Sequence, residues 1–326
     1  MRVFARPIVV VSKCIEYEPV RWDGRIISSD FVKQLKDYVD FVPVCPEVEI
    51  GLGIPREPLR IVKKEENIHL IQPATGLDLT QKMESFAKKF LDSLGDVDGF
   101  ILKSKSPSSA IKDARIYPSE KRVAAIGRGP GIFGKTVLEK FSNKAVEDEK
   151  RLLNERIREH FLTKLYTIAD FRNVRKSGTG NALVDFQGRN KLLLTAYSQI
   201  QLHAMGRLVA ERRRKPLTEI LTEYEEHLSA ALKRPPKTGA NCNVLTKAAG
   251  YFTSKLTHEE KAYFLDSVEK YRSGLQPLSA PLSILKSWII RFKEDYLEQQ
   301  TFFEPFPEKL RAIKREDSEE EKDYWK

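Results

Sequence analysis

The sequence has no long hydrophobic run and contains little cysteine, methionine or tryptophan. Each of these three residue types occurs three times among 326 residues, and apolar runs such as Ile8 to Val11 reach only about five residues. A helix that spans a membrane needs roughly 20 apolar residues, so the sequence predicts none. The start, MRVFARPIVVVSKC, also lacks the apolar core of a signal peptide, and we therefore expect a cytoplasmic protein.

The cysteines, Cys14, Cys45 and Cys242, are too few to form a disulfide framework, and their number is odd. Metal binding, catalysis or packing are the roles that remain for them. The composition is 41% hydrophobic and 31% charged, which is typical of a globular chain long enough for two domains.

Basic residues outnumber acidic ones, and the excess lies in the second half of the chain. The net charge is +10, with 22 lysines and arginines against 18 acidic residues over 1–135, and 32 against 22 over 136–315. The segment 316–326 is acidic, with two basic residues against six acidic ones. A basic surface attracts polyanions, nucleic acid first. The dense run from Arg212 to Lys215 could also be a solvated helix end.

Strands and helices alternate over the first half. Short β-branched or apolar runs predict strands over 7–12, 40–44, 99–103 and 122–126. Amphipathic stretches between them predict helices over 29–38, 79–94 and 136–141. This alternation predicts a doubly wound α/β fold with a parallel sheet.

The pattern is helical from about residue 143 onwards. Helices are predicted over 217–232 and 282–296, and another begins with a capping box of Thr257 and Glu260 and ends at Gly274. We therefore expect an α/β domain over 1–142, an all-α domain over 143–315 and an acidic, disordered tail over 316–326.

Chemically useful side chains follow three of the predicted strands. Cys14 follows the first strand, Cys45 and Glu47 follow the second, and a serine-rich run over 104–109 follows the third. Ligands of open α/β sheets bind in the crevice beyond the carboxyl ends of the strands, so we expect these residues to share one site. Two buried structural cysteines are the alternative.

One stretch, GRGPGIFGKT over 127–136, has the glycine and lysine spacing of a phosphate-binding P-loop. A nucleotide hydrolase would also need a later strand that ends in a magnesium-binding aspartate, and no convincing candidate follows. Glycine amides, a helix N-terminus and a lysine nevertheless attract anions. A phosphate contact is therefore expected at Gly131, Gly134 and Lys135.

The motifs around these residues resemble those of a known family. The stretches SKC, PVRWDG, VPVCPEVEIGLGIPREP, ILKSKSPS and GPGIFG, over roughly 5–150, resemble the TudS family of thiouracil desulfidases. The second half, with GRLVA, YRSGLQPLSAPLSILK and YLEQQTFFEPFP, resembles the YbgA-type helical domain. The same two-domain arrangement is found in RudS-type enzymes, which are similar to TudS and desulfurise 4-thiouridine in tRNA.

The resemblance implies a [4Fe–4S] cluster and a thiolated uracil as substrate. In TudS-like enzymes three cysteines hold the cluster and leave one iron open as a soft Lewis acid that can take sulfur. By resemblance, Cys14 and Cys45 are ligands, Glu47 moves protons, and Ser106 and Asp23 orient substrate or water. A salt bridge or a helix cap is the alternative role of Glu47, and an Asp-Gly turn that of Asp23. The residues expected to contact substrate are Arg21, Arg56, Lys103 and Ser108.

The sequence departs from both families. The third ligand cysteine is expected at position 109, where this chain has Ser109, followed by Ala110 in place of the usual glycine. A hydroxyl is a hard, weakly acidic donor. Ser109 therefore either binds iron as an alkoxide, or marks the loss of the cluster, or is a deliberate isosteric replacement. In the helical domain, relatives have histidines where this chain has Asn190, Tyr197, Asn241 and Lys247.

Together these observations predict an iron–sulfur-dependent desulfidase of thiolated uracil, with 4-thiouridine in tRNA as the expected substrate. The alternative is a cluster-free relative that binds RNA or a nucleotide, and a P-loop nucleotidase is a third interpretation. The helical domain is expected to dock RNA through Arg207, Arg212, Arg213, Arg214 and Lys215.

Overall fold

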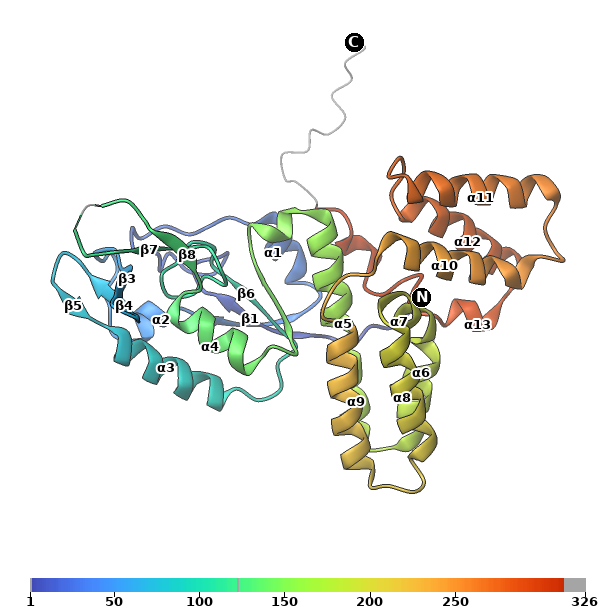
Figure 1. Ribbon diagram of the computed structural model, residues 1–326, viewed down its shortest axis with the longest axis horizontal. Coiled ribbons are helices and arrows are strands. Elements are labelled where there is room, and N and C mark those ends of the chain that lie inside the picture. Colours follow the sequence, from blue (N-terminus) through green and yellow to red (C-terminus); the bar gives the residue numbers. More distant parts are fainter. Residues whose placement is uncertain (1, 122, 314–326) are drawn as a thin grey trace, which may run out of the picture. The chain divides into compact units, whose positions relative to one another are not determined.

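The computed structural model describes residues 2–121 and 123–313, which divide into two compact units (Figure 1). Unit 1 comprises the chain up to Ala169 together with the residues from Pro307 onwards. Unit 2 runs from Asp170 to Phe306. The predicted tail over 316–326 lies outside the described residues.

A four-stranded parallel sheet forms the centre of unit 1. Its strands are β1 (Ile8–Ser12), β2 (Asp40–Val44), β6 (Gly99–Leu102) and β9 (Ala145–Asp148), in the order β2-β1-β6-β9. The chain moves outwards from β1 to β2 and then returns to add β6 on the other side of β1. The strand order therefore reverses between β1 and β6, which makes this edge the topological switch point where ligands of such sheets bind.

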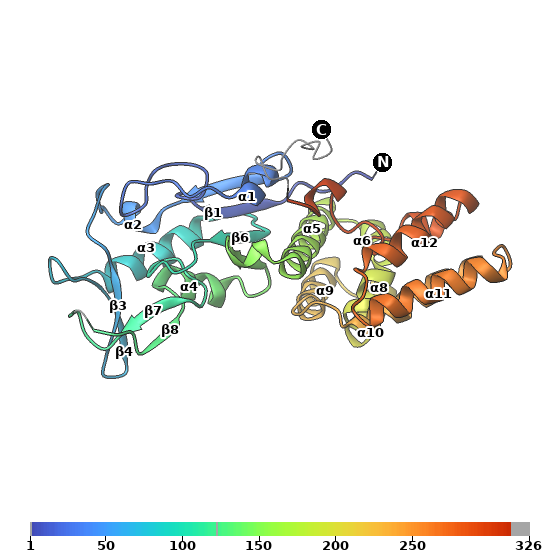
Figure 2. The same ribbon diagram turned by 90° about the horizontal axis from the view of Figure 1, so that it is seen from above.

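Helices cover both faces of this sheet. Figure 2 shows α1 (Asp30–Leu35) on one side of β1 and α3 (Thr80–Ser93) and α4 (Ile132–Lys140) on the other. Ser29 caps α1 by accepting a hydrogen bond from the amide of Val32, as an N-terminal serine does. The predicted doubly wound α/β class is confirmed for this part of the chain, and so are the first three predicted strands.

The fourth predicted strand is wrong. Residues 123–126 form no strand, and the fourth strand of the sheet is β9, which pairs with β6 over Gly99–Leu102. Strand β9 ends in two acidic residues, Glu147 and Asp148, so its sequence lacks the apolar pattern that predicts a strand. The predicted domain boundary after residue 142 would cut β9 from its sheet, and the compact units divide at residue 169 instead.

A second, mixed sheet of five strands also belongs to unit 1 and was not predicted. Its order is β5-β4-β3-β7-β8, with β3 parallel to β7 and the other neighbours antiparallel. The segment that leads from β2 of the parallel sheet to this second sheet begins with the short helix α2 (Pro46–Glu49). The five strands are Arg60–Lys64 (β3), Asn67–Gln72 (β4), Leu77–Asp78 (β5), Ala114–Tyr117 (β7) and Gly127–Gly129 (β8).

Unit 2 is built of helices, so the predicted all-α class of the second part is confirmed. Helix α5 (Glu155–Ser177) contributes residues to both units. The capping box of Thr257 and Glu260 is present at the start of α11. The other helices are Gly180–Arg189 (α6), Lys191–Tyr197 (α7), Gln199–Glu211 (α8), Leu217–Ala231 (α9), Thr238–Ala249 (α10), His258–Arg272 (α11), Ser279–Phe292 (α12) and Asp295–Glu298 (α13).

Two hydrophobic cores stabilise these helices. One joins α6, α8 and α9 to the end of α5, with Tyr224 and Phe186 fully buried at its centre. The other joins α7 with α10 to α13 and contains Cys242, which is fully buried. Apolar burial of this extent is the main source of helix stability in proteins. In the part of the chain described here, no helix is both long and apolar enough to cross a bilayer.

Candidate active site

A cavity of about 760 Å³ lies beyond the carboxyl ends of β1, β2 and β6. Most of the residues predicted for the site line it, so the structure brings these sequence-distant side chains together. Trp22 and Glu149, which were not predicted, line it as well. The predicted residues on its wall are Cys14, Arg21, Cys45, Glu47, Arg56, Lys103, Ser106 and Ser109.

The two thiols of the cavity come from neighbouring strand ends. Cys14 follows β1, and Cys45 is the residue before Pro46, with which α2 begins. Both are buried. Burial raises the pKa of Cys14 to about 12, and the nearby Cys45 adds to the effect. Burial likewise raises the pKa of Cys45. Both thiols are therefore neutral in the ligand-free protein near pH 7.

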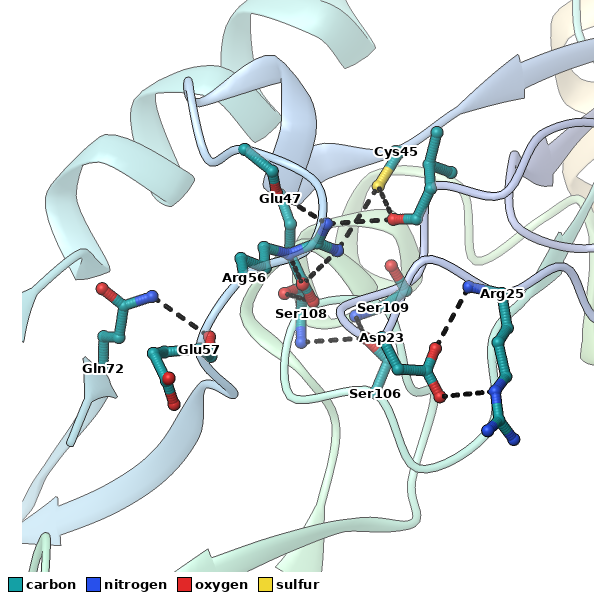
Figure 3. Close-up of polar contacts among 12 residues, drawn as sticks. Asp23, Arg25, Cys45, Glu47, Arg56, Glu57, Gln72, Ser106, Ser108 and Ser109 are labelled. Carbon is teal, nitrogen blue, oxygen red and sulfur yellow. Dashed lines mark hydrogen bonds and ion pairs between the residues drawn. The ribbon is translucent and has the colours of Figure 1, made fainter. Parts of the chain in front are cut away.

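Glu47 is held between a buried arginine and a buried serine (Figure 3). The Arg56 guanidinium donates to one carboxylate oxygen from Nε at 2.8 Å and lies 2.6 Å from it through Nη2. The Ser108 hydroxyl donates to the other oxygen at 2.7 Å. Only 6% of the Arg56 side chain and 13% of the Glu47 side chain are exposed. Such a charge-assisted pair in a nearly buried site fixes the orientation of the carboxylate.

Two of the residues predicted to contact substrate, Ser108 and Arg56, make contacts within the protein. Ser108 is completely buried and does not line the cavity, because its hydroxyl is directed to Glu47. Arg56 lines the cavity, but its guanidinium also donates to the carbonyls of Val20 and Gly53 and lies 4.0 Å from Cys45 Sγ. Both residues position Glu47, and the salt bridge that was the alternative role of Glu47 is present.

The loop after β6 is closed by Ser106. Its hydroxyl oxygen accepts the amides of Ser108 at 3.2 Å and Ser109 at 3.0 Å, which fixes the turn that carries Ser109 to the cavity (Figure 3). Ser109 is 4% exposed and lines the cavity with the two thiols. The donor that the sequence places at the third ligand position is therefore a hydroxyl at the cavity wall.

The glycines of GPGIFG pack against this same loop. A Cβ on Gly131 would overlap the backbone of Ser108, and a Cβ on Gly134 would overlap the carbonyl oxygen of Ala110. The amides of Gly131, Ile132 and Gly134 already donate to the carbonyls of 107–110. Lys135 is exposed and lies 3.9 Å from Glu139. The predicted phosphate contact is thus corrected to a packing role, because these amides are used within the protein.

Asp23 lies in the segment after Cys14, next to Trp22, which lines the cavity. Asp23 does not line the cavity; it accepts the amide of Arg25 at 3.3 Å and lies 3.4 Å from Arg21 (Figure 3 shows the contacts with Arg25). Gly24, which follows it, has a positive φ of 70°. The Asp-Gly turn that the sequence left open as the alternative role of Asp23 is therefore present, and the role on substrate stays a prediction.

Lys103 is bound to a carboxylate that the sequence analysis missed. Its Nζ lies 2.5 Å from Glu149 Oε1 and donates to the carbonyl of Ser104 at 2.8 Å. Glu149 Oε2 accepts the amide of Ser104, and Asp113 accepts the Ser104 hydroxyl and the Lys105 amide. The signal for Glu149 was its place directly after a strand end, but β9 itself was not recognised.

The predicted RNA-docking residues lie in unit 2, at α8 and the turn before α9. Arg207, Arg213 and Arg214 are exposed. Arg212 donates to the carbonyl of Val209, and Lys215 lies 3.3 Å from Glu211 and 3.8 Å from Glu223. Part of the predicted basic charge is therefore paired with acidic neighbours.

Two of the four positions at which the sequence analysis expects histidine in relatives, Asn190 and Asn241, are buried and hydrogen-bonded in unit 2, whereas Lys247 is exposed. Asn190 accepts a hydrogen bond from the Thr301 hydroxyl, and Asn241 donates to the Tyr271 hydroxyl. Throughout the described residues, no cluster of three or more histidine, cysteine, aspartate or glutamate side chains is arranged to hold a metal ion. The cavity of unit 1, with its two thiols and held carboxylate, remains the candidate site.

Comparison with known proteins identifies the family. A family model described as 2-thiouracil desulfurase matches residues 9–149, and one described as a protein of unknown function, DUF1722, matches residues 191–307. The uncharacterized protein YbbK of Bacillus subtilis (strain 168) is 31% identical over 108 residues, which are 31% of this chain and 72% of YbbK. The chain belongs to the 2-thiouracil desulfurase family.

Two further similarities accompany this family membership. The uncharacterized protein YbgA of Escherichia coli (strain K12) is 27% identical over 155 residues, which are 47% of the chain and 92% of YbgA. The solved structure of the [4Fe–4S]-dependent thiouracil desulfidase TudS is 28% identical, with a TM-score of 0.37, and the match covers 45% of the chain and 94% of TudS. The two family models and the similarity to YbgA confirm the two-domain resemblance that the motifs predicted.

Proposed function

We propose that this chain removes sulfur from a thiolated uracil, with 4-thiouridine in tRNA as its substrate. The observation that carries the proposal is the held carboxylate: Glu47, fixed by Arg56 and Ser108, lines the same cavity as Cys14 and Cys45. Membership of the 2-thiouracil desulfurase family supports the thiocarbonyl substrate.

The reaction is a hydrolysis. Water adds to the carbon of the C=S group, Glu47 takes a proton from it as general base, and a C–O bond forms. The carboxyl group then returns its proton to sulfur, and the carboxylate takes the remaining hydroxyl proton as the C–S bond breaks. The carbonyl replaces the thiocarbonyl, sulfur leaves as hydrosulfide, and one proton is released to water. Arg56 and Ser108 each hold one carboxylate oxygen of Glu47 in a constant direction. No electrons are exchanged with an outside partner.

The residues of the cavity fit a [4Fe–4S] cluster at two positions and depart from it at the third. Cys14 and Cys45 are buried thiols beside Lys103 and Arg56, whose charges favour an anionic group. Ser109 has the position of the third ligand but not the donor chemistry, because a hydroxyl is harder and less acidic than a thiol. Such a cluster would be held by these three residues and would supply an open iron with affinity for sulfur.

The alternative function is that of a cluster-free relative that binds RNA or a nucleotide without desulfurising it. Ser109 is the observation that favours it. In either case, RNA is proposed to dock on unit 2 through the exposed Arg207, Arg213 and Arg214, with a smaller share from Arg212 and Lys215, which have partners in the protein. The cytoplasmic location expected from the sequence stays a prediction.

The test is the iron and acid-labile sulfide content after reconstitution without oxygen. The parent is compared with Ser109→Cys, and Ser109→Cys/Cys45→Ser is the control that removes a thiol again. Iron in the parent, with sulfide released from 4-thiouridine, supports the proposed desulfidase. Iron and sulfide release only in Ser109→Cys would contradict it and favour the binding function.

A further inference from the structure

Trp22 is an exposed aromatic side chain on the wall of the candidate active site. It is 44% exposed and lines the cavity that contains Cys45 and Glu47. Tryptophan is usually well buried, and an exposed one gains significance when it borders a binding cavity. The neighbouring Arg21 also lines this cavity, with its guanidinium carbon 5.9 Å from the centroid of the indole.

The backbone around Trp22 is fixed to the held carboxylate. The Trp22 carbonyl accepts the amide of Arg56 at 2.9 Å, and the Val20 carbonyl accepts the Arg56 guanidinium at 3.0 Å. Arg56 in turn holds Glu47. The Asp-Gly turn that follows closes the segment. The backbone that carries the indole is thus fixed relative to Glu47, as a binding platform requires.

We infer that Trp22, together with Arg21, forms a stacking subsite for a base of single-stranded RNA that flanks the nucleotide in the cavity. Every nucleobase has a π face that can stack on an indole, and an arginine beside it adds attraction to the base and to the phosphate. RNA that is read by proteins is bound mostly through unpaired bases stacked on aromatic and arginine side chains. The inference deepens the proposed function, since it rests on RNA rather than a free base being the substrate.

Binding without catalysis provides the test. The affinity of the full chain is measured by fluorescence anisotropy for a labelled single-stranded RNA that carries uridine in place of 4-thiouridine. Trp22→Ala is expected to weaken binding about tenfold or more, the usual effect of removing one base–aromatic stack. Trp22→Phe keeps an aromatic face and is expected to stay within about threefold of the parent. Tyr263→Ala, at a 67% exposed aromatic on α11, is the matched control and is expected to leave the affinity unchanged.

A second RNA, the same sequence paired into a full duplex, removes the free base faces. The difference between the parent and Trp22→Ala is expected to disappear with this duplex. An affinity change below about twofold in Trp22→Ala overturns the inference, and so does an equal loss in Trp22→Phe or an undiminished loss on the duplex. Sulfide release is measured separately, so failure of the desulfidase proposal leaves this binding result interpretable.

Discussion

At the scale of single residues, the chemistry of the site depends on what holds one carboxylate. Glu47 belongs to α2, Arg56 to the following loop and Ser108 to the loop after β6, and the three meet through hydrogen bonds of 2.7–2.8 Å. A carboxylate with both oxygens engaged cannot turn away from the cavity without breaking one of these bonds. In the proposed reaction, each partner would therefore act by orienting Glu47.

Ser108→Ala tests this orientation. Loss of one hydrogen bond to a charged group costs about 1.5–3 kcal/mol, so we expect kcat for sulfide release to fall by about tenfold to a hundredfold with a smaller change in KM. The measurement is steady-state sulfide release, made in the Ser109→Cys background if the parent is inactive.

Ser93→Ala is the matched control for this change, because Ser93 is exposed at the end of α3 and its hydroxyl donates to the Phe90 carbonyl of the same helix. It is expected to behave as the parent does. If Ser108→Ala keeps the kcat of the parent, the proposed positioning role is refuted.

Single residues also show which parts of the candidate site could be predicted from the sequence. Cys14, Cys45 and Glu47 were found because they follow strands whose carboxyl ends share an edge, a rule that needs only the strand pattern. The roles of Ser108 and Asp23 could not be found in this way. Whether a side chain faces a cavity or a neighbouring carboxylate depends on contacts between loops that are distant in sequence.

At the scale of elements, the site is shaped by how closely α4 approaches the loop over 107–110. Gly131 and Gly134 let the helix backbone lie against this loop, and amides at the start of α4 donate to the loop carbonyls. The glycine spacing that resembles a P-loop thus allows close packing between two segments of the same chain, α4 and the loop over 107–110. The sequence showed that backbone approaches something closely there, but not what it approaches.

Gly134→Ala separates these two roles of the glycine turn. The added Cβ would overlap the Ala110 carbonyl, so we expect a loss of about 1–3 kcal/mol in the free energy of unfolding and a displaced Ser109 loop. Urea unfolding and iron content of the reconstituted protein are the measurements. Gly127→Ala, where a Cβ meets nothing within 4 Å, and Lys135→Ala are expected to behave as the parent. Loss of RNA or nucleotide binding in Lys135→Ala would restore the phosphate interpretation.

Helix α5 carries two ionisable side chains that are largely withdrawn from water. Burial, with Lys164 as a further cause, lowers the pKa of His160 to about 4, and burial, with Lys144 as a further cause, lowers the pKa of Lys164 to about 8. Between pH 8 and 10.5 the unfolded chain binds the Lys164 proton and the folded chain does not. Stability from this group therefore rises with pH across that window.

Lys164→Met removes this dependence. We expect the variant to be more stable than the parent at pH 7 by about 2–4 kcal/mol, and the two to converge towards pH 10.5. Urea unfolding at several pH values from 7 to 10.5 measures the difference. Lys88→Met, at an exposed lysine of α3, is expected to leave the slope as it is. A gap that stays constant with pH would show that the effect is one of packing.

The elements themselves were mostly predictable where one pattern dominates. Strands β1, β2 and β6 and helices α1, α3 and α9 follow the expected ranges closely because their apolar residues keep a clear period. Strand β9 and the five-stranded sheet were missed, since their strands are short or end in charged residues. Pairing with a neighbour, rather than their own composition, makes these segments strands.

At the scale of the whole molecule, an excess of positive charge is the main long-range property. The net charge is +10, yet ion pairs such as that of Lys215 with Glu211 reduce the local excess in the predicted docking run. Affinity for RNA is therefore expected to depend on where the unpaired charges lie, as well as on their number.

Charge reversal at two places separates location from net charge. Arg213→Glu/Arg214→Glu and Lys233→Glu/Arg234→Glu change the net charge equally, at opposite ends of α9. We expect the first pair to weaken RNA binding more and to reduce the slope of log K against log salt by about 2. Filter binding at 50–300 mM salt measures both quantities. Equal effects of the two pairs would mean that RNA responds to net charge alone.

The return of the chain to unit 1 after unit 2 has a consequence for synthesis. Gln34 of α1 contacts the carbonyls of Lys309 and Ala312, and the buried guanidinium of Arg158 donates to the carbonyl of Arg311. A ribosome makes these residues after those of unit 2. Unit 1 therefore lacks its C-terminal residues while unit 2 is translated. Nascent chains stalled before residue 307 should therefore be cut by protease within the first unit more readily than full-length chains, although every residue of its parallel sheet has already emerged.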